Sequence, residues 1–133
     1  MHTADPVLPT VLLVEDDPAA LRFYADALAG SGFQVKEASN GAQALRSAEA
    51  GGVSVIVADL GLPDFDGFEV CRQVKLRAET RQVPVIAITG RAMALRDIEL
   101  AEEVGFDAVL IKPCPPESLV TAIGKALNGS GSS

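Results

Sequence analysis

The chain has 133 residues, enough for one domain with a sizeable core and too few for two. Hydrophobic residues make up 48% and charged residues 22%, an ordinary globular composition. The net charge of -7 argues against a protein that binds DNA or an anionic membrane through a basic face, and it suits a cation or a basic partner.

The pattern along the chain predicts five strands, each followed by a helix. The strands are apolar runs, except that residues 33–37 alternate apolar and polar side chains, which is typical of a half-solvated edge strand. In chain order we expect strand 10–14, a helix from Pro18 that Gly30 and Gly32 stop, strand 33–37, helix 40–50, strand 53–58, helix 66–77, strand 83–88, helix 92–104, strand 107–111 and helix 116–127. Three helix starts carry N-cap or capping-box patterns: Asp17, Asn40 with Gln43, and Asp66 with Glu69.

This alternation predicts the fold class. Short connections between strands and helices imply right-handed crossovers, so the chain is predicted to be α/β, a doubly wound five-stranded parallel sheet with helices on both faces. We expect one domain over residues 10–127, a flexible N-terminal arm over 1–9, and a tail over 128–133 that is flexible or a cloning scar.

Other classes of site are disfavoured by composition. His2 is the single histidine and lies in the predicted arm, which nearly excludes a His-based zinc site or a Ser-His-Asp triad. Cys71 and Cys114 form no CxxC pair, so we expect two reduced thiols. No apolar run approaches 18 residues and no signal-peptide pattern opens the chain, so we expect a cytoplasmic protein.

Polar residues follow four of the five predicted strands. Glu15, Asp16 and Asp17 follow the first strand, Asp59 the third, Thr89 the fourth and Lys112 the fifth. Each alone would read as a solvated loop residue, and for Asp17 a helix cap is the favoured role. Because parallel strands end at one edge of a sheet, we expect these groups to converge.

The convergent groups indicate a chemistry. Clustered carboxylates raise each other's pKa unless a cation lies among them, and a few hard oxygen ligands suit Mg²⁺. With Lys112 and Thr89 available for phosphoryl oxygens, a carboxylate there could act as a nucleophile that forms an aspartyl-phosphate.

Four motifs in order, VLLVEDDP, VADLGLPDFDGFE, VIAITG and LIKP, resemble the receiver domain of two-component response regulators over residues 11–127. The resemblance implies a flavodoxin-like sheet of order 2-1-3-4-5. It implies that Asp59 is the phosphoacceptor, that Asp16 contacts Mg²⁺ directly and that Glu15 acts largely through water. Gly61 would offer its backbone carbonyl to the metal.

The resemblance also gives roles to the later motifs. Thr89 would contact the phosphoryl group and Lys112 would pair with it, with the Lys112–Pro113 bond often cis in this family. Gly90 fits the small-residue position of the family.

Three positions depart from the family pattern, and two more leave the lifetime of the phosphorylated state open. Val109 stands where a Tyr or Phe usually acts as a switch side chain, and Cys114 stands where Phe is common. Pro115 replaces a capping Asp or Ser before the last helix. Arg91, with Gly61, occupies a position that resembles those tuning phosphoryl hydrolysis.

The resemblance therefore implies a phosphorelay protein rather than an enzyme, one that supports its own phosphoryl transfer and slow dephosphorylation. The donor would be a phosphohistidine on a histidine kinase or a histidine phosphotransfer protein. A protein partner would bind the face of the fourth helix, fifth strand and fifth helix, and a phosphorylation-dependent homodimer is a further expected partner. We expect no direct contact with nucleic acid or membrane.

Three rival functions compete with this interpretation. A haloacid-dehalogenase-type phosphatase needs an Asp two residues after the nucleophile, where this chain has Gly61. A flavodoxin-like carrier needs a Ser/Thr/Gly-rich phosphate loop after the first strand, where this chain is acidic, and only Tyr24 could stack on a flavin. An interaction module regulated without phosphorylation is opposed by Asp59, Asp16, Thr89 and Lys112 and mildly favoured by Val109.

Overall fold

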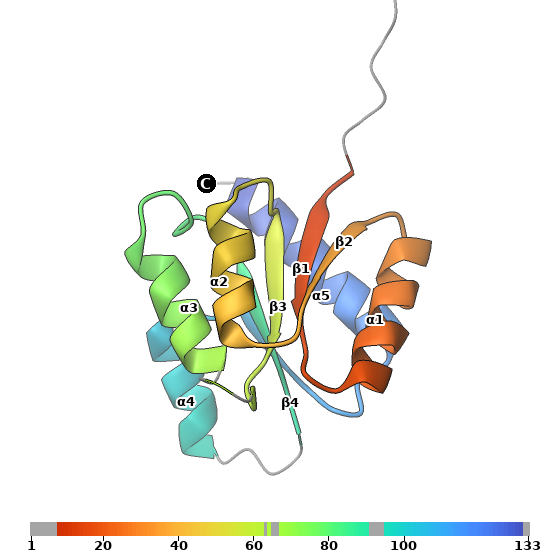
Figure 1. Ribbon diagram of the computed structural model, residues 1–133. Coiled ribbons are helices and arrows are strands. Elements are labelled where there is room, and N and C mark those ends of the chain that lie inside the picture. The colour runs from red at the N-terminus through yellow and green to blue at the C-terminus, as the bar shows by residue number, and fades with distance from the viewer. Residues whose placement is uncertain (1–7, 63, 65–66, 91–94, 132–133) are drawn as a thin grey trace, which may run out of the picture.

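A parallel sheet between two layers of helices forms the fold (Figure 1). The computed structural model describes residues 8–62, 64, 67–90 and 95–131. Its elements are β1 (Thr10–Val14), α1 (Pro18–Gly30), β2 (Gln34–Ala38), α2 (Gly41–Glu49), β3 (Val55–Asp59), α3 (Gly67–Leu76), β4 (Val85–Thr89), α4 (Leu95–Val104), β5 (Ala108–Ile111) and α5 (Pro116–Gly131).

The predicted order of elements is confirmed, with small differences at their ends. The largest lies in α5, which continues through Gly131 rather than ending at Leu127. The predicted cap Asp66 and the first residues predicted for the fourth helix, 92–94, lie outside the described residues, as do His2 and Arg91.

The strand order β2-β1-β3-β4-β5 confirms the predicted topology. All four strand pairs are parallel, so every strand ends at the same edge of the sheet, the lower edge in Figure 1. Residues in β1 are fully buried, whereas β2 at the sheet edge buries only Ala38 completely. The half-solvated character expected of residues 33–37 is therefore confirmed.

Each face of the sheet carries its own apolar cluster. On one face, β1, β3 and β4 pack against α1 and α5 through Tyr24, Ala25, Leu28, Leu119 and Ile123. On the other face, the same strands pack against α2, α3 and α4 through Ala44, Ala48, Val70, Cys71, Val74 and Ala101. Successive strand residues point to opposite faces, which is why continuous apolar runs supply both clusters.

Helix starts follow the capping patterns in the sequence. The Asp17 carboxylate accepts a hydrogen bond from the Ala20 backbone N–H at 2.9 Å, and the Asn40 side chain accepts one from Gln43 N–H at 2.9 Å. The Gln43 side chain accepts from the Ser39 N–H rather than from the N-cap residue itself. Two of the three predicted caps, Asp17 and Asn40, are confirmed, the second with a shifted reciprocal bond.

The α2 N-terminus has a second, unpredicted partner. The Asp64 carboxylate accepts hydrogen bonds from Gly41 N–H at 2.8 Å and Ala42 N–H at 2.9 Å. A carboxylate is favoured at these unpaired donors at the positive end of the helix. Asp64 thereby attaches the segment between β3 and α3 to α2.

Among the described residues, no helix is long and apolar enough to cross a membrane.

Gly67 is a close-approach position beside the end of β3, and it generates a stability prediction. A Cβ at Gly67 would lie 2.7 Å from the Asp59 carbonyl oxygen, whereas a Cβ at Gly124 in α5 would have no atom within 4 Å. We expect Gly67→Ala to lower the free energy of unfolding by about 1–3 kcal/mol, because backbone must move to relieve the clash.

The matched control, Gly124→Ala, should raise the free energy of unfolding by about 0.5–1 kcal/mol, because alanine is the better helix former. Urea denaturation followed by circular dichroism measures both. Equal effects of the two substitutions would contradict the close approach at Gly67.

Candidate functional site

Three carboxylates meet at the edge where the strands end. Glu15 and Asp16 follow β1 and Asp59 ends β3, and one oxygen from each lies within 4.8 Å of the others. The strand order explains the meeting, because β1 and β3 are hydrogen-bonded neighbours with Val14 opposite Ala58. The predicted convergence of acidic groups is confirmed for these three residues.

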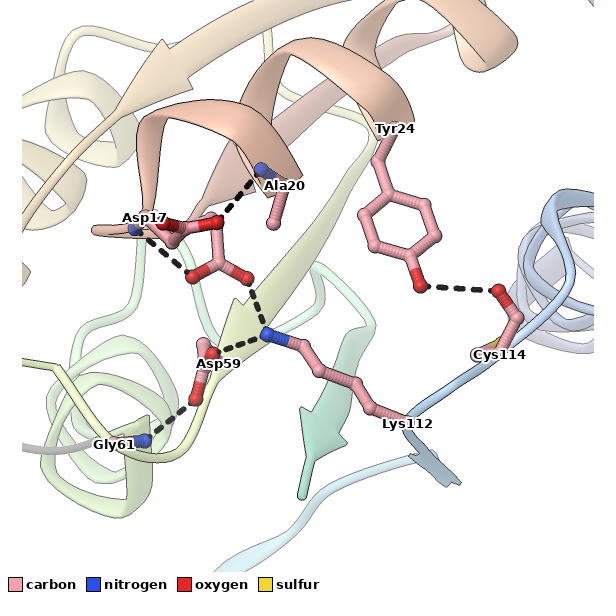
Figure 2. A network of polar contacts seen from close by, with 8 residues as sticks. Asp17, Ala20, Tyr24, Asp59, Gly61, Lys112 and Cys114 are labelled. Atoms are coloured by element: carbon pink, nitrogen blue, oxygen red, sulfur yellow. Dashed lines mark hydrogen bonds and ion pairs between the residues drawn. The ribbon is translucent and has the colours of Figure 1, made fainter.

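Asp59 is held at both carboxylate oxygens (Figure 2). Its Oδ1 accepts a hydrogen bond from the Gly61 backbone N–H at 2.7 Å, and its Oδ2 lies 2.7 Å from Lys112 Nζ. The side chain is 14% exposed, so it is reachable from solvent while being largely shielded. These contacts orient the carboxylate away from the core at the end of a buried strand.

Lys112 links two strands through its ammonium group. Its Nζ lies 2.6 Å from Glu15 Oε1 as well as 2.7 Å from Asp59 Oδ2. Burial alone would lower the pKa of Lys112, but the hydrogen bonds to Asp59 and Glu15 outweigh burial and raise it. Lys112 is therefore a permanent cation at this site.

Glu15 is the most buried of the three carboxylates, at 4% exposure. Its Oε2 accepts a hydrogen bond from the Asp17 backbone N–H at 3.1 Å. Burial raises its pKa, and the nearby Asp59 charge adds to this, while the bonds to Lys112 and the Asp17 N–H oppose the shift without cancelling it. A further positive charge beside Glu15 would therefore stabilise its ionised form.

The arrangement fits a divalent metal ion. Three carboxylates against one ammonium leave two formal negative charges when all are ionised. All the side-chain donors are hard oxygens, the ligands that Mg²⁺ prefers. Glu15 and Asp59 contact Lys112 directly, whereas Asp16 is exposed beside them and offers its carboxylate to solvent.

Thr89 and Gly61 complete the set of predicted site residues. Thr89 ends β4, where the register sets Asp59 opposite the preceding residue, Ile88. The Thr89 carbonyl accepts a hydrogen bond from the Lys112 N–H at 2.6 Å, which places the two residues on adjacent strand ends. Gly61 donates its backbone N–H to Asp59, whereas its predicted role involves only its carbonyl.

The positions that depart from the family pattern are now located. Val109 is partly buried against the cluster under α2, α3 and α4. Cys114 is buried in the opposite cluster, and the Pro115 carbonyl accepts hydrogen bonds from the Ser118 and Leu119 N–H groups in the first turn of α5. The Lys112–Pro113 peptide bond is cis.

Two polar contacts around the site were not anticipated. Asp64 joins the β3–α3 segment to α2, and the Tyr24 hydroxyl donates a hydrogen bond to the Cys114 carbonyl at 3.0 Å. The position of Tyr24 in α1 predicts a core residue. Nothing local in the sequence indicates its hydrogen bond to Cys114, which lies 90 residues away.

Comparison with known proteins places this geometry in a family. The model of the response regulator receiver domain matches residues 11–124. The transcriptional regulatory protein PrrA of Mycobacterium tuberculosis is 37% identical over 93% of this chain and 52% of its own length. The polar-differentiation response regulator DivK of Brucella anthropi is 34% identical over 78% of this chain and 84% of its own length.

Solved structures show the same architecture. A CheY-like response regulator receiver domain protein from Methanospirillum hungatei superposes with a TM-score of 0.85, at 29% identity over 93% of this chain and 97% of that one. The chain spans about half the length of the first curated relatives it matches. Family match, sheet order and the acidic edge agree: this chain belongs to the response regulator receiver domain family, a family of signalling domains of two-component systems.

Proposed function

We propose that the chain is the phosphoacceptor domain of a two-component phosphorelay and that Asp59 receives the phosphoryl group. The observation that carries the proposal is the arrangement of Asp59, whose carboxylate lies at the sheet edge between the Gly61 N–H and the Lys112 ammonium. A nucleophile held in this way has little orientational freedom to lose during the reaction.

The proposed step is an in-line displacement at phosphorus. An Asp59 carboxylate oxygen forms the new O–P bond while the P–N bond to the imidazole of a donor phosphohistidine breaks, and the imidazole takes up a proton as it leaves. Lys112 already lies 2.7 Å from one Asp59 oxygen and can transfer its hydrogen bond to a phosphoryl oxygen. Thr89, at the adjacent strand end, is assigned to a second phosphoryl oxygen.

Glu15 and Asp16 are assigned to a Mg²⁺ ion, together with Asp59 and the Gly61 carbonyl. The ion would neutralise phosphoryl charge that the acidic edge would otherwise repel. Asp16 would contact it directly and Glu15 largely through water. Support comes from the three clustered carboxylates and from the raised pKa of Glu15, which burial causes.

The proposed partners follow from the same chemistry. The donor would be a histidine kinase or a histidine phosphotransfer protein, and part of the sensor histidine kinase RcsC of Salmonella typhi is 29% identical to this chain. The output partner, or a second phosphorylated copy, would bind the α4–β5–α5 face. A groove of about 700 Å³ lies along β5 and α5, lined by Ala108, Leu110, Thr121, Ala122 and Lys125 among others.

The domain is proposed to signal rather than to turn over substrates, and to lose its own phosphoryl group slowly. Its proposed location is the cytoplasm. Direct binding to nucleic acid is not proposed for this domain, because its net charge of -7 would repel a phosphate backbone.

Phosphorylation at Asp59 is testable by intact-protein mass spectrometry. Incubation with a small acyl phosphate or phosphoramidate should add one phosphoryl group in the presence of Mg²⁺ and none after chelation. Asp59→Asn should abolish the gain, because an amide is not a nucleophile at neutral pH.

The control is Asp26→Asn, which removes an equal charge from an exposed position of α1 and should be labelled like the wild type. Labelling that survives Asp59→Asn would refute the assignment of the acceptor. If neither a small donor nor any kinase labels the wild type, the regulation without phosphorylation that Val109 mildly favours becomes the better hypothesis.

Glu15 provides a prediction about charge at the site. Its pKa in the folded protein is raised above the ordinary 4.5. The free energy of unfolding therefore falls as the pH rises from 4.5 through the folded-state pKa, because Glu15 ionises less readily in the folded protein than in the unfolded chain. Without divalent ions, Glu15→Gln should therefore have a higher thermal midpoint than the wild type at pH 7, and the difference should shrink as the pH falls toward 4.

Adding Mg²⁺ should raise the midpoint of the wild type more than that of Glu15→Gln, because the variant has lost one of the charges that attract the ion. The exposed Glu79→Gln is the matched control and should follow the wild type throughout. A Glu15→Gln protein that is less stable than the wild type without Mg²⁺ would show that the bond to Lys112 outweighs burial.

A further inference from the structure

Tyr24 is a buried polar residue beside the site with no role in the chemistry described above. It lies in α1, is 6% exposed, and its hydroxyl donates a hydrogen bond to the Cys114 backbone carbonyl at 3.0 Å (Figure 2). Cys114 comes two residues after Lys112, in the short connection between β5 and α5. Tyr24 therefore ties the first helix to the segment that carries the site's lysine.

The sequence of that connection explains why one hydroxyl matters. Residues 112–116 read Lys-Pro-Cys-Pro-Pro, so three of the five have no backbone N–H to donate. At its start, the Lys112 N–H bonds to the Thr89 carbonyl, and at its end the Pro115 carbonyl caps α5. Between these points the Tyr24 hydroxyl supplies the donor for the Cys114 carbonyl.

Tyr24 itself is firmly placed. Its ring packs in the cluster with Leu28, Leu119 and Ile123, and it meets the Phe23 ring edge-on with centroids 5.1 Å apart. Burial raises the pKa of the hydroxyl, which keeps it protonated as a donor. Removing the hydroxyl would leave a buried carbonyl unsatisfied unless the connection moved, at a cost comparable to a lost hydrogen bond.

Lys112 would respond to such movement. Its ammonium is held by two short contacts, to Glu15 and to Asp59, that come from two other strands. Both contacts require its backbone to stay at a set distance from β1 and β3. A shift of the following residues would strain or lengthen one of them.

We propose that Tyr24 is a positioning residue for Lys112: its hydroxyl holds the connection between β5 and α5 so that the ammonium stays between Glu15 and Asp59. The effect on phosphoryl transfer rests on the proposed function, whereas the effect on Lys112 itself does not.

The test is Tyr24→Phe, which keeps the ring and removes only the hydroxyl. Reductive methylation with formaldehyde and cyanoborohydride, followed by peptide mass spectrometry, measures the reactivity of each lysine. Lys112 should react about threefold faster or more in the variant, because its ammonium leaves the carboxylates more often. The exposed Lys125 is the internal reference and should not change.

Thr80→Val is the matched control. The buried Thr80 hydroxyl donates to the Val74 carbonyl at 2.7 Å, so the substitution removes the same kind of bond remote from Lys112. It should leave the reactivity of Lys112 unchanged. If Lys112 reacts equally faster in both variants, the cause is a general loss of stability and the proposal is overturned. The proposal is also overturned if Lys112 reacts no faster in Tyr24→Phe.

A reciprocal measurement does not depend on that variant folding. Tyr24 is the single tyrosine in a chain without tryptophan, so the intrinsic fluorescence excited at 280 nm comes from its ring. Lys112→Met should change this fluorescence because it releases the connection, whereas Thr80→Val should not. An unchanged spectrum in Lys112→Met would overturn the proposal.

Phosphorylation separates the two proposals. The rate at which Tyr24→Phe accepts a phosphoryl group from a small donor should fall to about one third of the wild-type rate or lower. If the wild type accepts none while Lys112 reactivity still rises in Tyr24→Phe, the phosphoacceptor assignment fails and the positioning role stands. If the wild type is phosphorylated and Tyr24→Phe matches it in both rate and Lys112 reactivity, the positioning role fails alone.

Discussion

The contact of one ammonium with two carboxylates organises the functional edge of this domain. Lys112 reaches Glu15 and Asp59, which lie at the ends of two neighbouring strands, and so balances part of the charge that the strand order gathers there. Loss of the ammonium would leave two neighbouring carboxylates of like charge without a cation. Both carboxylates therefore depend on the position of Lys112, and the backbone that carries the three residues has to be held with matching accuracy.

Several backbone contacts supply that accuracy. The Gly61 N–H orients Asp59, and Gly67 lets the start of α3 approach the Asp59 carbonyl more closely than a side chain would permit. Asp64 fastens the intervening segment to α2. Because these contacts come from α2, α3 and the turn itself, the position of the proposed phosphoacceptor is coupled to the packing of one whole face of the sheet.

On the other face, the same edge is tied to α1 and α5. Tyr24 reaches from α1 to the carbonyl of Cys114, just before α5 begins. Val109, at the position where receiver domains usually carry an aromatic switch, is packed into the opposite cluster and offers no polar group. Among the described residues, Tyr24 on α1 is an aromatic residue that contacts the segment after Lys112.

Sequence alone determined the alternation of strands and helices, the caps at Asp17 and Asn40, and the convergence of Glu15, Asp16 and Asp59, because these depend on short-range periodicity and on the common direction of parallel strands. The roles of these residues in phosphoryl transfer remain a prediction. Only the tertiary structure decided that Lys112 also binds Glu15, 97 residues away, and that Tyr24 meets Cys114 across 90 residues. Such pairs carry no local pattern, since their distance is set by how the helices pack on the sheet.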